Sequence, residues 1–192
     1  MRWEFEDFMI DRIVFTIVNA FKHSSELKKL NKQQVASLPE ISVQALASVG
    51  LLILDFDGVM ANHGEPKAFD AVVNWCHTLH QARADLPIYI LTNNPFSERS
   101  QFFATVLPFI NVEPLHKKKP YPEGVLAILA KSQVAPNQTL LIDDRLLTGG
   151  LAAILSGIDC WIIEKPFMDF RKRPIVESFF WGMRKFERTW FR

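Results

Sequence analysis

An apolar run that ends in two carboxylates is the most informative feature of the sequence. Residues 51–54 are all aliphatic, and Asp55, Phe56, Asp57 and Gly58 follow them. The run predicts a central parallel strand covered on both faces, whose carboxyl end is where open α/β sheets bind ligands. Alternate strand residues point the same way, so Asp55 and Asp57 should face one crevice. Two negative charges this close favour a bound cation, and oxygen ligands favour Mg²⁺. The alternative is an ordinary turn after a strand.

Two further segments place anion-binding groups at a strand end or a helix start. Thr92 and Asn93 follow the apolar run 88–91, and we expect both to bind a phosphoryl group, although a Thr here equally suits a turn. Lys119 closes a triplet of lysines directly before Pro120 and a predicted helix. A lysine at this point is placed to meet an anionic substrate, whereas an isolated lysine triplet is usually a solvated surface.

A second acidic pair, Asp143 and Asp144, ends the apolar run 140–142. Adjacent residues of a strand face opposite ways, so we expect one carboxylate to bind the metal directly and the other to act through water or another ligand. The predicted metal ligands are therefore Asp55, Asp57, Asp143 and Asp144.

Strand and helix patterns alternate along the middle of the chain, which is typical of a parallel sheet flanked by helices. The predicted strands span residues 51–55, 87–92, 109–112, 139–143 and 158–163, and the predicted helices span 66–82, 97–106, 122–132 and 146–156. These elements indicate an α/β, Rossmann-like core over about residues 50–163. Helical arms rich in aromatic residues, 1–48 and 164–192, complete one domain of 192 residues.

The composition shows no global charge bias. With 48% hydrophobic residues and a formal net charge of +1, the chain can bury a sizeable core, and no nucleic-acid partner is expected. Two cysteines are too few for a disulfide framework and fit a reducing compartment. No apolar run reaches the length of a membrane span, and the acidic start lacks the layout of a signal peptide. We expect a cytoplasmic protein, with peripheral attachment to the inner face of a membrane as a further possibility.

The two arms leave three roles open. Residues 3–21 place apolar and aromatic side chains around much of a predicted helix, and residues 165–192 combine aromatic side chains with an excess of Lys and Arg. Basic, aromatic and amphipathic helices favour an anionic bilayer surface. Packing on the core and contact between subunits are the alternatives, so the oligomeric state stays open.

The order Asp-x-Asp, Thr, Lys-Pro and Asp-Asp resembles the four motifs of the haloacid dehalogenase superfamily of phosphatases, over about residues 50–163. The resemblance implies an HAD-like fold in which Asp55 is the nucleophile and Asp57 the general acid and base. It also implies that Thr92 and Lys119 bind the phosphoryl group, and that Asp55, the backbone carbonyl of Asp57 and the acidic pair bind Mg²⁺.

Three stretches narrow this resemblance to the branch that contains phosphatidylglycerophosphate phosphatases: residues 119–124, residues 141–150, and Glu177, Arg184, Glu187 and Arg188. The fourth motif of that branch usually reads Gly-Asp and later Thr-Asp, whereas this chain has Asp143-Asp144 and later Gly149. Asp143 would then compensate for the missing later acid. Gly58-Val59 also stands where that branch commonly has Asn-Thr.

The implied activity is Mg²⁺-dependent hydrolysis of a phosphomonoester through an aspartyl-phosphate. Only 34 residues lie between Asp57 and Thr92, and 26 between Thr92 and Lys119, which leaves no room for a cap domain. An uncovered site admits a phosphate carried by a large molecule, so the expected substrate is a lipid phosphate such as phosphatidylglycerophosphate. His63 and Glu65 would either touch its head group or form a solvated turn.

Two other functions remain open. The first is a cytoplasmic phosphatase for a soluble sugar phosphate, a nucleotide or a nucleic-acid end. The second is a non-catalytic binding module on the same fold, which the glycine at position 149 suggests. The remaining histidines lack metal-ligand spacing and are expected to be structural or exposed: His23, His77, His80 and His116.

Overall fold

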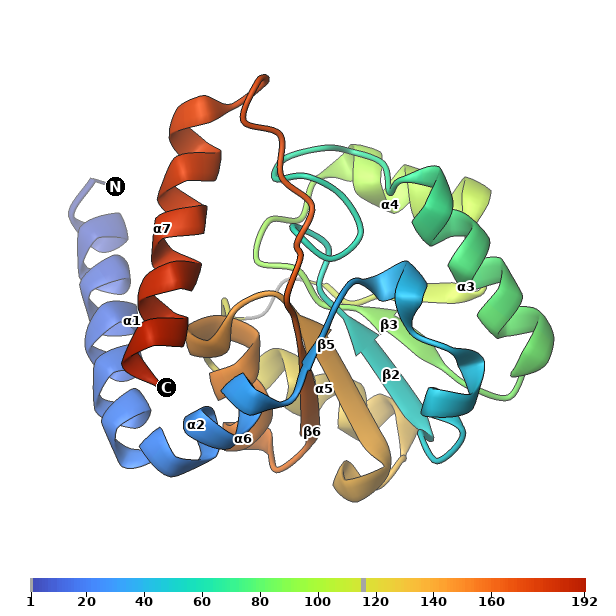
Figure 1. The fold of residues 1–192 in the computed structure, drawn as a ribbon, viewed down its shortest axis with the longest axis horizontal. Coiled ribbons are helices and arrows are strands. Elements are labelled where there is room, and N and C mark those ends of the chain that lie inside the picture. Colours follow the sequence, from blue (N-terminus) through green and yellow to red (C-terminus); the bar gives the residue numbers. More distant parts are fainter. Residues whose placement is uncertain (1, 115–116) are drawn as a thin grey trace.

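Within residues 2–114 and 117–192, which the computed structural model describes, six strands form one parallel sheet (Figure 1). The strand order is β1-β6-β5-β2-β3-β4. The strands are β1 (Gln34–Val35), β2 (Leu51–Leu54), β3 (Ile88–Ile90), β4 (Ile110–Val112), β5 (Thr139–Asp143) and β6 (Asp159–Ile163). The predicted α/β class with a parallel sheet is confirmed.

Helices cover both faces of the sheet. They are α1 (Arg2–Lys22), α2 (Ser24–Lys32), α3 (Asp70–Ala82), α4 (Ser97–Val106), α5 (Glu123–Ser132), α6 (Leu151–Ser156) and α7 (Pro174–Trp190). One apolar cluster joins α3 and α4 to one face, and a second joins α5, α6 and parts of α1 and α2 to the other. The side chains of residues 2–9 are not described. The predictions for Trp3, Phe5, Phe8 and His116 therefore lie outside the described part of the chain.

Strand β2 shows why the apolar run forms the centre of the sheet. All four of its side chains are fully buried. Leu52 and Leu54 pack in the cluster with α3, whereas Leu51 and Ile53 pack in the cluster with α5 and α6. The alternation of a strand thus buries both sides of the run and brings its carboxyl end, with Asp55, to the edge of the sheet.

Three elements differ from the expected ones. The helix predicted at 66–82 begins at Asp70, because residues 66–69 belong to a loop in which Phe69 N–H bonds the Met60 carbonyl at 3.0 Å. The helix predicted at 146–156 is divided into a π-helix, Leu146–Gly150, and α6. Strand β1 lies in the predicted N-terminal arm and pairs with β6, so the sheet extends beyond residues 50–163.

The segments that surround the carboxyl edge of the sheet are short. Residues 55–69 after β2 and 91–96 after β3 are loops, and no domain is inserted in either of them. The connection from β4 to α5 spans residues 113–122, and its described part, which leaves out 115 and 116, is also a loop. The described segments that follow β2, β3 and β4 at this edge are therefore loops.

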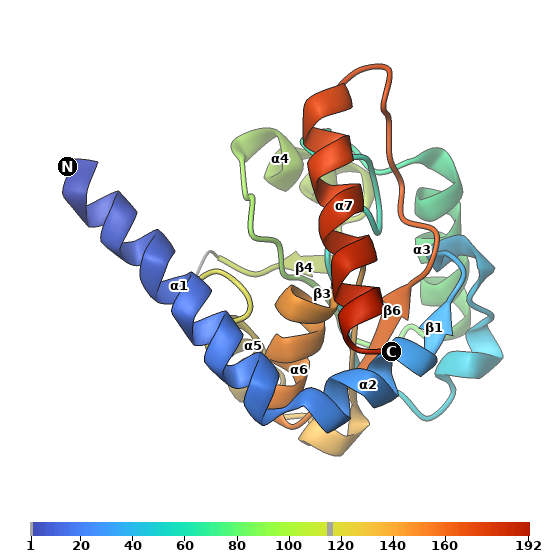
Figure 2. The ribbon, with the colours of Figure 1, turned by 60° about the vertical axis from the view of Figure 1, so that its left-hand side comes forward.

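The two arms differ in how they meet the core. The N-terminal half of α1 projects from the body of the molecule (Figure 2). The C-terminal half of α1 contacts other elements: the Phe15 ring lies 4.3 Å from the Tyr121 ring, and the Phe21 ring lies 6.4 Å from the Trp190 ring of α7. Helix α7 packs on the core through buried charged residues. None of the described helices is long and apolar enough to cross a membrane.

Candidate active site

Lys119 lies between two of the predicted acidic residues. Its Nζ is 3.0 Å from Asp55 Oδ1 and 2.5 Å from Asp143 Oδ2, and all three side chains are buried. Burial alone would lower the pKa of Lys119, but Asp143 and Asp55 raise it above its ordinary value, so the amine stays protonated. The structure therefore brings together the ends of β2 and β5 and the lysine next to Pro120.

Asn93 holds the backbone of this lysine. Its Oδ1 accepts a hydrogen bond from the Lys119 N–H at 2.7 Å, and its Nδ2 donates to the Lys119 carbonyl at 3.1 Å. The Asn93 side chain therefore positions Lys119. The second hydrogen of Nδ2 and the backbone N–H are left for its predicted phosphate contact.

Three carboxylates form a group that fits a metal ion. Asp55, Asp143 and Asp144 are buried, and each offers an oxygen within 4.8 Å of the others. Burial raises the pKa of Asp55 well above its ordinary value against the opposing charge of Lys119, and it raises that of Asp144 to about 6. Three carboxylates face only two cationic side chains, Lys119 and Arg184, so a hard, oxygen-preferring cation such as Mg²⁺ would balance the remaining negative charge.

The side chain of Asp57 does not join this group, and the metal ligand predicted from this residue is its backbone carbonyl. Its two oxygens accept hydrogen bonds from Arg99 at 2.6 and 3.0 Å, and Oδ1 also accepts one from the Gly64 N–H at 2.9 Å. Arg99 also donates to Thr92 Oγ1 at 3.3 Å. The Asp57 side chain is thus held by Arg99 and lies apart from the three carboxylates.

Two glycines make room for the acidic pair. A Cβ built on Gly149 would lie 2.1 Å from the carboxyl carbon of Asp143. The Asp143 carboxylate therefore fills the space that a side chain at position 149 would need, which fits the prediction that Asp143 replaces the missing later acid. Gly58 has φ +82°, and a Cβ there would lie 2.5 Å from Asp144 Oδ2. Both positions favour glycine on steric grounds.

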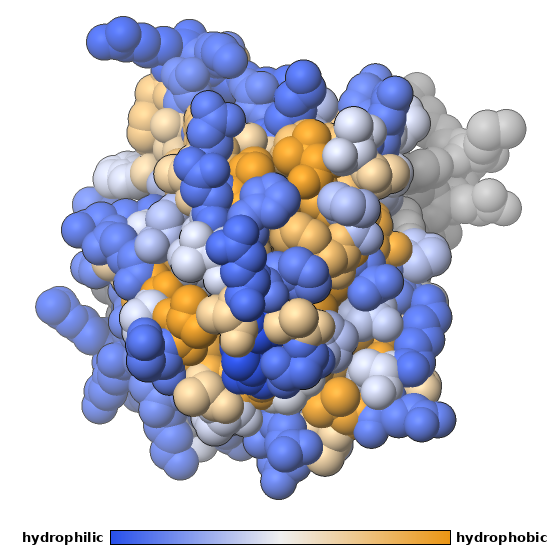
Figure 3. Space-filling view, turned by 90° about the vertical axis from the view of Figure 1, so that its right-hand side faces the viewer, coloured by the Kyte–Doolittle hydropathy of each residue, from blue (hydrophilic) through white to orange (hydrophobic). Residues whose placement is uncertain are grey.

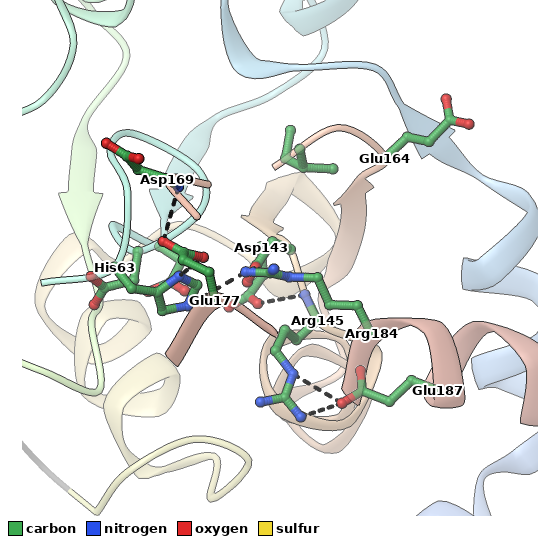
Figure 4. Close-up of polar contacts among 12 residues, drawn as sticks. His63, Asp143, Arg145, Glu164, Asp169, Glu177, Arg184 and Glu187 are labelled. Atoms are coloured by element: carbon green, nitrogen blue, oxygen red, sulfur yellow. Dashed lines mark hydrogen bonds and ion pairs between the residues drawn. The ribbon is translucent and has the colours of Figure 1, made fainter. Parts of the chain in front are cut away.

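The C-terminal helix reaches the acidic pair. Arg184 Nε donates to Asp144 Oδ2 at 2.6 Å, and its NH2 also contacts that oxygen. Arg145 forms an ion pair with the buried Glu187, whose other oxygen accepts a hydrogen bond from Leu147 N–H at 3.2 Å. Figure 4 shows Arg184 and Glu187, and the contact between Glu187 and Arg145. Arg184 is buried against Asp144, unlike the exposed Lys185 next to it.

His63 is part of the same buried network, so the prediction of a solvated turn is wrong for it. Its ring stacks on Phe180 at 4.1 Å, and its Nδ1 lies 3.3 Å from Glu177 Oε2. Burial and the charge of Arg184 lower the pKa of His63, and Glu177 opposes them. Glu65 uses its backbone carbonyl to accept from Arg99, while its side chain pairs with Lys172 at 3.1 Å.

Arg99 was not singled out in the sequence, and Arg184 was named only as part of the family resemblance, without a role at the site. Arg99 lay inside a correctly predicted helix, where nothing marked it as buried. Arg184 had a usable signal, because Glu177, Arg184 and Glu187 are spaced seven and three residues apart and so share one face of a helix. The three are nearly inaccessible to solvent in the structure.

No family model matches the chain, and no curated protein matches its sequence. Its fold is similar to that of an uncharacterised protein from Listeria monocytogenes serotype 4b (TM-score 0.50, 12% identity, 66% of this chain and 85% of that one). A haloacid dehalogenase-like hydrolase from Streptococcus pneumoniae gives a TM-score of 0.48 at 14% identity, over 64% of this chain and 88% of that one. D,D-heptose 1.7-bisphosphate phosphatase from B. bronchiseptica, complexed with magnesium and phosphate, gives 0.47 at 18%, over 62% and 82%. At these identities the likeness concerns the fold.

Proposed function

We propose that the chain is a Mg²⁺-dependent phosphomonoester hydrolase with Asp55 as its nucleophile. The observation that carries this proposal is the position of Lys119 Nζ, 3.0 Å from Asp55 and 2.5 Å from Asp143 in a group of three buried carboxylates. A buried cation beside a nucleophile and a candidate metal site is suited to a phosphoryl group, whose transfer depends mainly on positioning and electrostatics.

The reaction proceeds in two displacements. An oxygen of Asp55 attacks phosphorus, the bond to the leaving oxygen breaks, and Asp57 gives that oxygen a proton. In the second step Asp57 takes a proton from water, the water oxygen attacks phosphorus, and inorganic phosphate leaves with Asp55 restored. Lys119 and the Thr92 hydroxyl stabilise the charge on the phosphoryl oxygens.

The carboxylates of Asp55, Asp143 and Asp144 would hold Mg²⁺, together with the Asp57 carbonyl. When bound, the ion supplies positive charge to the phosphoryl oxygens and to the ionised nucleophile. The experiment that tests the reaction is release of p-nitrophenol from its phosphate ester by the full chain. We expect hydrolysis with Mg²⁺ and none after chelation; hydrolysis that chelation leaves unchanged would contradict the proposal.

A lipid phosphate is the substrate that we favour, because of a basic groove beside the site. The groove, of about 930 Å³, lies between α2, the segment after β6 and α7. Its basic lining residues are Lys32, Lys165, Arg184, Lys185, Arg188 and Arg192. Arg184 belongs both to this groove and to the contact with Asp144. A substrate with a second anionic group, such as the phosphodiester of phosphatidylglycerophosphate, would find complementary charge there.

The exposed apolar side chains also favour a lipid surface. Most of the large ones in the described part of the chain lie on α1 and α7: Ile10, Ile13, Val14, Ile17, Val18 and Phe21, and Ile175, Val176, Phe179, Trp181, Phe186 and Trp190. Viewed from the α3 side, by contrast, hydrophilic side chains interrupt the hydrophobic areas (Figure 3). Apolar helices beside a basic groove complement an anionic bilayer.

Vesicles test this part of the proposal. Each basic residue near an anionic bilayer contributes about 1 kcal/mol, so K185Q/R192Q should weaken sedimentation with phosphatidylglycerol vesicles roughly 30-fold. Turnover of phosphatidylglycerophosphate in those vesicles should fall together with vesicle binding, while turnover of an aryl phosphate should be unchanged. The matched control K185R/R192K keeps both charges and should behave as the wild type.

Other outcomes separate the alternatives. If the wild-type protein does not sediment with vesicles and cleaves soluble sugar phosphates or nucleotides faster than the lipid, it is a phosphatase for soluble substrates. One that sediments with vesicles but cleaves no phosphate ester would be a binding module.

A further inference from the structure

Arg99 joins two predicted catalytic elements that are far apart in sequence. Its guanidinium donates to both carboxylate oxygens of Asp57, from NH2 at 2.6 Å and from NH1 at 3.0 Å, and NH1 lies 3.3 Å from Thr92 Oγ1. It also donates to the backbone carbonyls of Asn94 at 2.9 Å and Glu65 at 3.1 Å. One side chain thus ties together the loops that follow β2 and β3.

The position of Arg99 is unfavourable unless it is paired. It lies in the first turn of α4, where the helix dipole disfavours a cation, and its side chain is almost fully buried. The guanidinium lies over two aromatic rings, 4.0 Å from the centroid of Phe56 and 4.2 Å from that of Phe96. Two carboxylate contacts and two rings hold it in one orientation, so its partners are held as well.

The contacts leave distinct atoms of the two partners open. Asp57 Oδ1 accepts from both Arg99 and the Gly64 N–H, whereas Oδ2 accepts only from Arg99. Oδ2 therefore keeps an acceptor site for a further hydrogen bond. Thr92 Oγ1 accepts hydrogen bonds from the Asn94 N–H at 3.1 Å and from Arg99 at 3.3 Å. These two hydrogen bonds use both lone pairs of the Thr92 oxygen. The Thr92 hydroxyl is then left to donate its own hydrogen.

We infer that Arg99 is a positioning residue, which aims Oδ2 of Asp57 at the leaving group and the attacking water, and the Thr92 O–H at the phosphoryl group. The inference rests on the proposed function. Arg99 does not touch Asp55, Asp143 or Asp144 in any of its hydrogen bonds, so its effect should appear in turnover and not in metal binding.

Kinetics of R99K test the inference, because lysine keeps the charge but cannot form the bidentate contact. With p-nitrophenyl phosphate and Mg²⁺ we expect kcat to fall about 10- to 100-fold, with KM and the Mg²⁺ half-saturation changed less than about threefold. R83K is the matched control. Arg83 also donates to several backbone carbonyls, those of Leu46, Ala47 and Val49, but it lies at the C-terminal end of α3.

A double-mutant cycle separates positioning from a purely structural role. If Arg99 acts through Asp57, R99K should cost much less in a D57N background than in the wild type. Equal losses in both backgrounds would overturn the inference. If R99K does not fold, F96L is the variant to measure. It removes one of the two aromatic rings that contact the Arg99 guanidinium, and it should lower kcat about two- to fivefold at constant KM. An unchanged kcat would overturn the inference.

The proposed function and this inference fail in different ways. A wild-type protein that releases no p-nitrophenol would overturn the proposed function and the inference with it. An active wild type with a fully active R99K would overturn the inference alone.

Discussion

Arg184 Nε donates to Asp144 Oδ2 at 2.6 Å, so the C-terminal helix is part of the candidate metal site. Both side chains are nearly inaccessible to solvent, and Arg184 NH1 has no hydrogen-bond partner among the described residues. A buried carboxylate that receives a charge-assisted hydrogen bond is held in one orientation, and such outer contacts strongly affect metal affinity.

Arg184→Gln should therefore weaken metal binding. We expect the Mg²⁺ concentration for half-maximal activity to rise about 10- to 100-fold. The free energy of unfolding should fall by about 3–5 kcal/mol, because the buried Asp144 loses its partner. K185Q changes the neighbouring, exposed residue and should leave both quantities unaltered with an aryl phosphate. Titration of activity with Mg²⁺ and denaturant unfolding measure the two effects; a normal Mg²⁺ requirement in R184Q would contradict the role of Arg184.

Gly149→Ala should disturb the acidic pair, since the new Cβ would overlap the Asp143 carboxylate. We expect a loss of about 1–3 kcal/mol in the free energy of unfolding and no thermal stabilisation by Mg²⁺. Gly182→Ala, in the open middle of α7, is the control and should stabilise the protein by up to about 1 kcal/mol. A G149A protein that Mg²⁺ stabilises as much as the wild type would refute this steric account.

Stabilisation by Mg²⁺ should depend on pH. Burial raises the pKa of Asp144 to about 6, and a metal ligand must be ionised, so the increase in Tm with Mg²⁺ should shrink as the pH falls through about 6. For the metal-free protein, the contribution of Asp144 to stability changes with pH in the opposite direction. A carboxyl whose pKa rises on folding favours the folded state at low pH, and this contribution is lost as the pH rises through about 6. Thermal melts with and without Mg²⁺ at several pH values measure both trends, and D144N should flatten them. Equal increases in Tm above and below that pH would contradict the prediction.

Lys119→Met should abolish most activity. The lysine is buried between two carboxylates, so its loss removes a positive charge from the phosphoryl site, and we expect kcat to fall about 10²- to 10³-fold. Lys117→Met is the matched control, because Lys117 is exposed and pairs with Glu123. Steady-state kinetics of the two variants measure this difference. Similar losses of kcat in both would mean that the lysine triplet acts only as a charged surface.

The strands of the core and the residues at their ends could be predicted because each rests on a local pattern. An apolar run such as 140–142 specifies a buried strand by itself, and parallel strands end at one edge. Strand β1 could not be predicted, because its two residues are only partly buried and are too few for a strand period. It exists because Val35 pairs with Ile163 at the edge of the finished sheet.

The buried arginines show a second limit. A pattern of charges does not say whether a guanidinium faces water or a carboxylate, since that depends on contacts 42 residues apart for Arg99 and Asp57, and 40 for Arg184 and Asp144. The role of the two aromatic arms could not be predicted from the sequence for the same reason. Helix α7 turned out to combine a buried charged face with an exposed apolar one, which the counts of residue types did not separate.

Turnover of p-nitrophenyl phosphate by D55N tests the central claim most directly. An amide fills the space of the carboxylate but cannot form the phosphoryl bond, so activity with Mg²⁺ should fall below a few per cent of the wild type while the melting temperature changes little. D85N, which makes the same change at an exposed aspartate, should be fully active. Substantial activity in a pure preparation of D55N would contradict the account.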